Sequence, residues 1–350
     1  MFGLIVDYQT LNKNINMRKI LVLSIAIITS LVTSCTSDGE KEERLLPSSS
    51  GRMNELVVVM KHDLWKGKVG NEVRDIFNAD VEGLPQPEPL YRVAHIDPNA
   101  FTSTFKAARS LFIVKLEQND KAKLNFSDKI YAQPQTVIEL SANTEEALIK
   151  ALKKYKKEIV KRYHDQDIKA IQKRFRRIKH KDLPFLTEEG ISMIIPKSYT
   201  AIDLREKFWW YRSDIREGKH YPSLNLLIYI TPMKSELDLT GQNIISTRDS
   251  IGKLYIGGAV KGAYMQTEKR PQYYPTMTNT LINGEVAIET RGLWMVKGDF
   301  MGGPFINYTI FDEENKRIIT ADAFVYGAGV KKRDLIFPME AIIKSLKISK

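Results

Sequence analysis

The sequence has 350 residues, of which 43% are hydrophobic and 27% are charged. These proportions are typical of a folded globular protein, exclude a chain that is disordered throughout, and give a length that suggests about two domains. The single cysteine, Cys35, excludes an internal disulfide, and the formal net charge is +11.

Residues 1–34 combine an upstream extension with the features of an export signal. Met17-Arg18-Lys19 supplies a positive start, and the mostly apolar run Ile20–Val32 follows. This run is shorter than the roughly 20 residues that cross a bilayer as a helix. Residues 1–16 precede the signal, so Met17 is the expected start of the natural chain.

The segment Leu31-Val32-Thr33-Ser34-Cys35 resembles a bacterial lipobox. The resemblance implies that the Cys35 sulfur carries lipid, palmitate among its acyl chains, and that cleavage makes Cys35 the first residue. Two or more acyl chains hold a protein stably at a membrane. The alternative is an ordinary secretory signal. Because residue 36 is threonine rather than aspartate, the expected location is the outer membrane of a cell envelope, facing the periplasm or the cell surface.

Residues 35–54 are polar and predict a flexible tether. Residues 55–142 predict an N-terminal α+β domain. Its expected strands, in chain order, are Leu56–Met60, Tyr91–Ile96, Leu111–Leu116 and Ile130–Leu140. Its expected helices are Leu64–Phe77 and Asp97–Ala108. Pro134 places the last of these strands at an edge or a bulge.

Residues 143–182 predict one long helix. Asn143 with Glu146 resembles a capping box, and apolar residues then recur at helical spacing until the pattern ends near Lys181. The same stretch explains the basic charge of the protein. Lys150–Lys181 holds fourteen Lys or Arg residues against three acids, a net charge of +11, while the rest of the chain after residue 34 sums to −2.

Residues 187–350 predict a C-terminal antiparallel α+β domain. Arg248–Ile256 predicts a short helix and Leu335–Leu346 a closing amphipathic helix. The predicted strands are Ile191–Ile195, Phe208–Tyr211, Leu224–Ile230, Gly284–Met295, Phe305–Asp312 and Arg317–Tyr326. The expected fold class is therefore α+β, with two α+β domains of mainly antiparallel sheets joined by a long basic amphipathic helix.

The basic helix suggests a surface for anionic partners. Membrane lipid or lipopolysaccharide fits a lipid-anchored body, and nucleic acid is not an expected partner. The alternative is a solvated helix face without a ligand. The candidate residues for contact with an anionic surface are Lys169, Lys173, Arg174, Arg176, Arg177 and Lys179.

From Glu55 onward the chain resembles an uncharacterised family of Bacteroidota lipoproteins, a domain of unknown function. The segments Arg291–Trp294 and Met301–Phe305 carry much of this resemblance. Thr187–Lys350 also resembles the PsbP-like α/β/α sandwich. Residues 301–304 predict a turn or bulge with positive φ. The candidate ligand-contact residues are Arg291, Trp294, Gly302 and Gly303.

No residues are singled out as catalytic or metal-binding, and no cofactor is expected. The five histidines lack a zinc-like spacing, and no G-x-S-x-G elbow or phosphate loop occurs. The aromatic runs Trp209-Trp210-Tyr211 and Tyr273-Tyr274 are candidates for exposed stacking faces. The expected function is a non-catalytic binding or structural module that meets an envelope protein, glycan or glycolipid. The alternatives are a hydrolase of an envelope glycan and an anionic-lipid binder.

Overall fold

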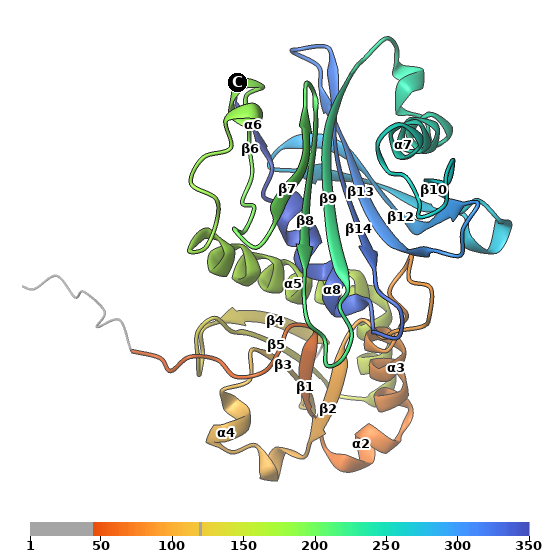
Figure 1. The fold of residues 1–350 in the computed structure, drawn as a ribbon. Helices are drawn as coiled ribbons and strands as arrows, with labels where there is room; N and C mark the ends of the chain where they lie inside the picture. Colours follow the sequence, from red (N-terminus) through yellow and green to blue (C-terminus); the bar gives the residue numbers. More distant parts are fainter. Residues whose placement is uncertain (1–44, 119–120, 350) are drawn as a thin grey trace, which may run out of the picture. The chain divides into compact units, whose positions relative to one another are not determined.

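The computed structural model describes residues 45–118 and 121–349 (Figure 1). The upstream extension, the signal, Cys35 and the first half of the predicted tether, up to residue 44, lie outside these residues. From Pro47 onward the chain forms one contact unit that contains two separate β-sheets. No helix in the described part is both long and apolar enough to cross a membrane.

The first sheet has five strands in the order β2-β1-β3-β5-β4. Its three neighbouring pairs from β2 to β5 are parallel, and only β4 pairs antiparallel with β5. The strands β3 and β5 are apolar and almost wholly buried, as expected for parallel strands covered on both faces. The strands are β1 (Glu55–Val59), β2 (Arg92–Ile96), β3 (Ser110–Leu116), β4 (Lys123–Asp128) and β5 (Thr136–Ala142).

Short helices connect these strands. The predicted helix Leu64–Phe77 is divided at Gly67 into α2 (His62–Lys66) and α3 (Lys68–Phe77). The predicted helix Asp97–Ala108 is a 3₁₀ turn, Pro98–Ala100, followed by α4 (Ser103–Lys106). Asp97 does cap this turn, since its side chain accepts a hydrogen bond from the Asn99 backbone.

Helix α5 (Glu145–Arg176) lies between the two sheets and contributes to both cores (Figure 1). It begins one residue later than expected, because Thr144 rather than Asn143 caps it, through a 3.1 Å bond from the Ala147 backbone. It ends before Lys181, at Arg176. Its apolar stripe is divided. The first core takes Leu148, Ala151, Leu152, Ile159 and Tyr163, and the second core takes Ile168, Ile171 and Phe175.

The second sheet has eight strands, all paired antiparallel, in the order β10-β12-β13-β14-β9-β8-β7, with β11 also paired to β12. The strands are β7 (Thr200–Arg205), β8 (Phe208–Asp214), β9 (Ser223–Pro232), β10 (Tyr264–Thr267), β11 (Thr276–Ile282), β12 (Glu285–Lys297), β13 (Gly302–Asp312) and β14 (Arg317–Tyr326). A small pair, β6 (Ile191–Ser192) and β15 (Lys347–Ile348), lies apart.

Helices cover both faces of this second sheet. Helix α8 (Arg333–Ile343) and the end of α5 pack on one face, and α7 (Gly241–Tyr255) packs on the other. The remaining helical turns are α6 (Pro184–Glu188) and the 3₁₀ segments Glu236–Leu239 and Pro271–Tyr273.

The α+β prediction with mainly antiparallel pairing is confirmed for the molecule as a whole. The N-terminal sheet departs from it, because the long connections between its first strands return the chain in the same direction. Pro134 also lies outside β5, which is an interior strand rather than the expected edge.

Candidate functional site

A cleft of about 750 Å³ opens between α3 with its following loop, α5, β12 and α8. Its size falls within the range of about 300–1,000 Å³ that small-molecule sites occupy. Apolar side chains from three of these elements and from the loop before β2 form its walls: Ile76, Leu90, Val160, Ile336 and Phe337. Charged side chains gather at one end, so the cleft combines an apolar body with a polar floor.

The polar floor is centred on Glu340, whose side chain is 1% exposed. Its carboxylate accepts from Arg291 Nη2 at 2.8 Å, from Lys344 Nζ at 2.8 Å and from His164 Nε2 at 3.0 Å. The Tyr308 hydroxyl lies 3.2 Å from the same carboxylate. A buried carboxylate with four partners meets the condition under which burying a charge is tolerated.

The spacing of residues along β12 and α8 places two pairs of these groups side by side. Glu289 and Arg291 are two apart on β12, so both point to the face that α8 covers, and the Arg291 guanidinium pairs with the Glu289 carboxylate. Glu340 and Lys344 are four apart, at the end of α8, and lie on one side of it. His164 comes from the middle of α5, and its ring meets Phe337 edge-on.

Mutual charge fixes the protonation states in this cluster. Burial alone would raise the pKa of Glu340, but Arg291 and His164 hold it well below its ordinary value. Burial alone would lower the pKa of His164, yet Glu340 and Asp165 raise it above its ordinary value. Glu340 therefore stays ionised, and His164 keeps its proton to a higher pH than a free histidine.

The four predicted ligand-contact residues are separated by the second sheet. Arg291 lies in the cleft, whereas Trp294, three residues further along β12, belongs to the core beneath α7. Trp294 is 4% exposed, and its indole Nε1 donates to the Val325 carbonyl at 3.2 Å. Trp294 therefore packs in the core beneath α7 and does not line the cleft.

The glycines Gly302 and Gly303 begin strand β13, and neither has positive φ, so the predicted turn is wrong. Their small size is required for a different reason. A Cβ on Gly303 would lie 2.2 Å from the Val325 carbonyl oxygen, and one on Gly302 would lie 2.8 Å from the Trp294 carbonyl oxygen. These residues allow neighbouring backbones to approach, and they do not line the cleft described above.

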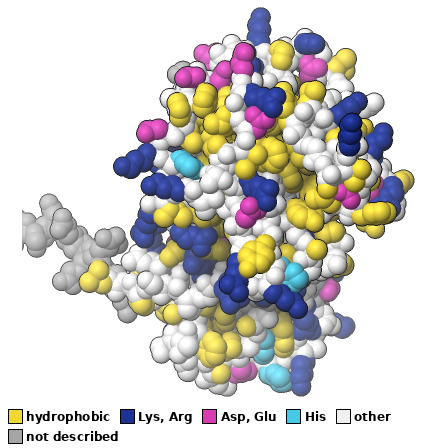
Figure 2. Space-filling model, in the orientation of Figure 1, with side chains coloured by type: hydrophobic (Ala, Val, Ile, Leu, Met, Phe, Trp, Pro, Cys, Tyr) yellow, Lys and Arg dark blue, Asp and Glu magenta, His cyan; other side chains and the backbone are white. Residues whose placement is uncertain are grey.

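The six predicted anion-contact residues are all exposed, at the C-terminal end of α5 and just after it. None of the six forms an ion pair with another described residue. Figure 2 shows Lys and Arg side chains gathered in this region, on the left of the view. The basic surface is defined by Lys169, Lys173, Arg174, Arg176, Arg177 and Lys179.

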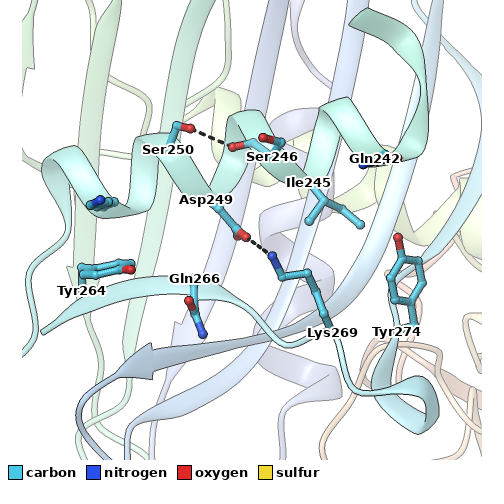
Figure 3. A pocket seen from close by; sticks show the side chains of 10 residues that line it. Gln242, Ile245, Ser246, Asp249, Ser250, Tyr264, Gln266, Lys269 and Tyr274 are labelled. Carbon is cyan, nitrogen blue, oxygen red and sulfur yellow. Dashed lines mark hydrogen bonds and ion pairs between the residues drawn. The ribbon is translucent and has the colours of Figure 1, made fainter. Parts of the chain in front are cut away.

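A second, shallower hollow of about 580 Å³ lies between α7 and β10. Tyr264 and Tyr274 stand at its two ends, with Asp249 and Lys269 between them (Figure 3). Asp249 accepts from Lys269 Nζ at 2.8 Å and from the Thr267 backbone at 2.7 Å, so its charge is satisfied within the protein.

The aromatic runs have different environments. Tyr273 and Tyr274 are 41% and 51% exposed, as proposed for a stacking face, whereas Trp209 and Tyr211 are buried in the second core. In the part of the chain that the structure describes, no group of three or more His, Cys, Asp or Glu side chains is arranged to hold a metal ion.

Family comparisons cover nearly all of the described residues. Residues 179–345 match a domain of unknown function (DUF4837), and residues 49–176 match a second domain of unknown function (DUF8532). No curated protein is similar enough to this chain to count as a match. The two matches together support an uncharacterised family, with one domain of unknown function matched in each half of the described residues.

Two solved structures resemble about half of the chain. The Ran-binding protein Mog1p of Saccharomyces cerevisiae has 10% identity and a TM-score of 0.30, over 47% of this chain and 92% of that one. A point mutant of the protein Mog1 has 9% identity and a TM-score of 0.27, over 46% and 92%. TM-scores this low support no conclusion about fold or function, so the PsbP-like arrangement stays a prediction. The Bacteroidota assignment also stays a prediction.

Proposed function

We propose that this chain is a lipid-anchored protein of the cell envelope, and that its folded body is a non-catalytic module that binds a ligand in the cleft. The proposed anchor is Cys35, at the outer membrane. One observation carries the binding role. The cleft joins apolar walls to a floor of charged groups that are paired with one another, which gives a preformed shape with fixed polarity.

The alternative, a hydrolase acting on an envelope glycan, is less well supported. Such enzymes use two carboxyl groups, one of which donates a proton and has a raised pKa. The floor of the cleft does contain two carboxylates, Glu289 and Glu340, but they share Arg291 and the Tyr308 hydroxyl as partners. The pKa of Glu340 is lowered, so it is poorly suited to donate a proton.

The anchor is tested with Cys35→Ala and with globomycin, which blocks lipoprotein signal cleavage. We expect Cys35→Ala to remove the protein from the membrane fraction, because the acyl chains supply the attachment, and globomycin to make a larger, uncleaved precursor accumulate. Incorporation of an alkyne-labelled palmitate should disappear with Cys35→Ala. Unchanged fractionation and labelling would contradict the proposal.

The cleft is tested with a bulky substitution on its wall. Ala79 is exposed and lines the cleft, so Ala79→Trp should fill it without disturbing a core. With the fluorescent probe N-phenyl-1-naphthylamine, we expect the signal to fall strongly in Ala79→Trp. The matched control is Ala201→Trp, at an exposed position of β7, which should bind the probe as the parent does. Equal binding by both variants would refute the cleft as the site.

A second function is favoured by the unpaired charges of the basic surface. We expect it to hold the body against anionic lipid, with an affinity that falls steeply as salt rises. The test is co-sedimentation of the Cys35→Ala chain with vesicles containing phosphatidylglycerol. Neutralising Lys173, Arg174, Arg176 and Arg177 should abolish it. Neutralising four exposed lysines elsewhere should not, namely Lys123, Lys150, Lys261 and Lys331. Binding that is independent of salt would count against this function.

A further inference from the structure

We propose that the ligand of the cleft is an amphiphile with one anionic head group, a carboxylate or a phosphate, and an apolar tail. This inference rests on the proposed function, because it names the chemistry of the same site. The two ends of the cleft carry it independently: the floor offers donors and positive charge, and the walls offer apolar surface.

The first observation is an unused hydroxyl. Tyr91 lines the cleft although it is only 3% exposed, and no described residue forms a hydrogen bond with its hydroxyl. The hydroxyl is not among the polar atoms that are sealed from solvent without a partner, so it is open to the cleft. The ring is held in place by edge contacts with Phe77 and Tyr163. A ligand atom that accepts a hydrogen bond would complete this group.

The second observation is a guanidinium that is only partly used. Arg291 donates through Nε to Glu289 and through Nη2 to Glu340, which holds its plane rigidly. No described residue accepts from its Nη1, and the side chain lines the cleft. Arginine is well suited to carboxylate and phosphate oxygens, because its donors lie in a fixed plane.

The charge balance of the floor favours an anion. Two carboxylates, Glu289 and Glu340, face three cationic groups when His164 is protonated, since Arg291 and Lys344 are the other two. The flanking pair of Lys161 and Asp165 is self-compensating. Arg333 is likewise paired, with Asp334. When His164 is protonated, these groups together carry one more positive than negative charge.

Charges at the mouth of the cleft have both signs. Asp75, Asp80 and Glu82 lie on the side of α3 and its loop, and Lys156 and Lys157 lie on α5. All five are exposed, so water and salt screen them more than they screen the floor. The sign of the head group is thus decided by the buried groups.

The apolar walls of the cleft favour a ligand with an apolar tail. The apolar side chains that follow the floor come from the first core on one side, through Ile76 and Val160, and from α8 on the other, through Ile336 and Phe337. Each methylene that leaves water for such a surface should tighten binding by about fourfold. Affinity is therefore expected to rise along the series octanoate, decanoate and laurate.

The test is isothermal titration of the whole Cys35→Ala chain with laurate, dodecyl phosphate and dodecanol, each below its micelle concentration. We expect the two anions to bind at least tenfold more tightly than the alcohol, since a bond to a charged group is stronger than one to a neutral group. Laurate and dodecyl phosphate together identify which head group fits better. Equal affinity for laurate and dodecanol would overturn the ligand class.

The matched variants are Tyr91→Phe and Tyr274→Phe. Each loses only a hydroxyl, but Tyr274 lies in the hollow beside α7. We expect Tyr91→Phe to weaken laurate binding by about tenfold, to weaken dodecanol binding less, since its hydroxyl is a neutral acceptor, and to keep the thermal midpoint. Tyr274→Phe should change nothing. If Tyr91→Phe binds laurate as the parent does, the head-group position is wrong. If none of the three compounds binds, nor the naphthylamine probe, the proposed function itself fails.

Discussion

Glu88 provides a sharp test of how the two sheets are held together. This residue lies in the loop before β2, yet its carboxylate accepts from the backbone N–H of Lys332 at 2.6 Å and of Arg333 at 3.2 Å. These N–H groups are at the start of α8, where Lys332 offers no side-chain cap of its own. A side chain from the first half of the chain thus caps a helix of the second half.

The cost of removing this cap follows from its burial. Glu88 is 6% exposed, so Glu88→Ala would leave two N–H groups without an acceptor and without easy access to water. Each hydrogen bond to a charged group contributes about 1.5–3 kcal/mol, and a partly buried anion at a helix N-terminus contributes up to about 2 kcal/mol. Because these contributions overlap, we expect a total loss of about 3 kcal/mol. Glu88→Gln keeps one acceptor and should lose about half as much.

The assay is urea unfolding of the Cys35→Ala chain, followed by far-ultraviolet circular dichroism, with the denaturant slope checked for constancy. The control is Glu82→Gln in the same loop. Glu82 is exposed and makes one 3.1 Å bond to the Thr276 hydroxyl, so its loss should cost under about 0.5 kcal/mol. If Glu88→Ala costs no more than this control, the carboxylate does not act as the cap of α8.

Three further predictions follow from buried groups. Gly303→Ala should lower the thermal midpoint by several degrees, because its Cβ would lie 2.2 Å from the Val325 carbonyl oxygen; an unchanged midpoint contradicts this. Burial raises the pKa of Asp167 from 3.8 to about 6, so folding stability falls as pH rises through that interval. Asp167→Asn should therefore be more stable than the parent at pH 8, on the order of 2 kcal/mol, with the advantage lost at pH 3; urea unfolding at both pH values checks this. Arg248→Met leaves the wholly buried Asp322 without its cation. The free energy of unfolding, measured with urea, should fall by about 3–5 kcal/mol. A fall of less than about 1 kcal/mol would refute the importance of this ion pair.

Strands buried along nearly their whole length were predictable, and polar edge strands were not. The strands β9, β13 and β14 lie close to their predicted bounds because nearly every residue in them is buried. The strands β7 and β11 are mostly exposed, and β7 forms the sheet edge. Such strands form because their backbone groups make hydrogen bonds to a neighbouring strand. Their side chains are mostly exposed, so the sequence lacks the hydrophobic pattern that would predict them.

The cleft could be predicted only in part. Arg291 was selected through a family resemblance, yet Glu340 was hidden inside an apolar helix and His164 inside a basic one. A single acid in the otherwise apolar stretch Leu335–Ile343 was the available signal, because a buried carboxylate needs partners. Which partners it finds depends on the packing of α5 against α8, and no local pattern specifies a contact between residues that far apart.

Helix α5 has a consequence for any attempt to dissect this protein. The two family matches meet between residues 176 and 179, immediately after the helix. A cut there would leave Ile168, Ile171 and Phe175 on one fragment, while the sheet and α8 that bury them stay on the other. The fragment that keeps the helix would expose these apolar side chains to water. The other fragment would lack the residues that cover part of one face of its sheet. We therefore expect that neither matched region folds as a soluble unit without the other.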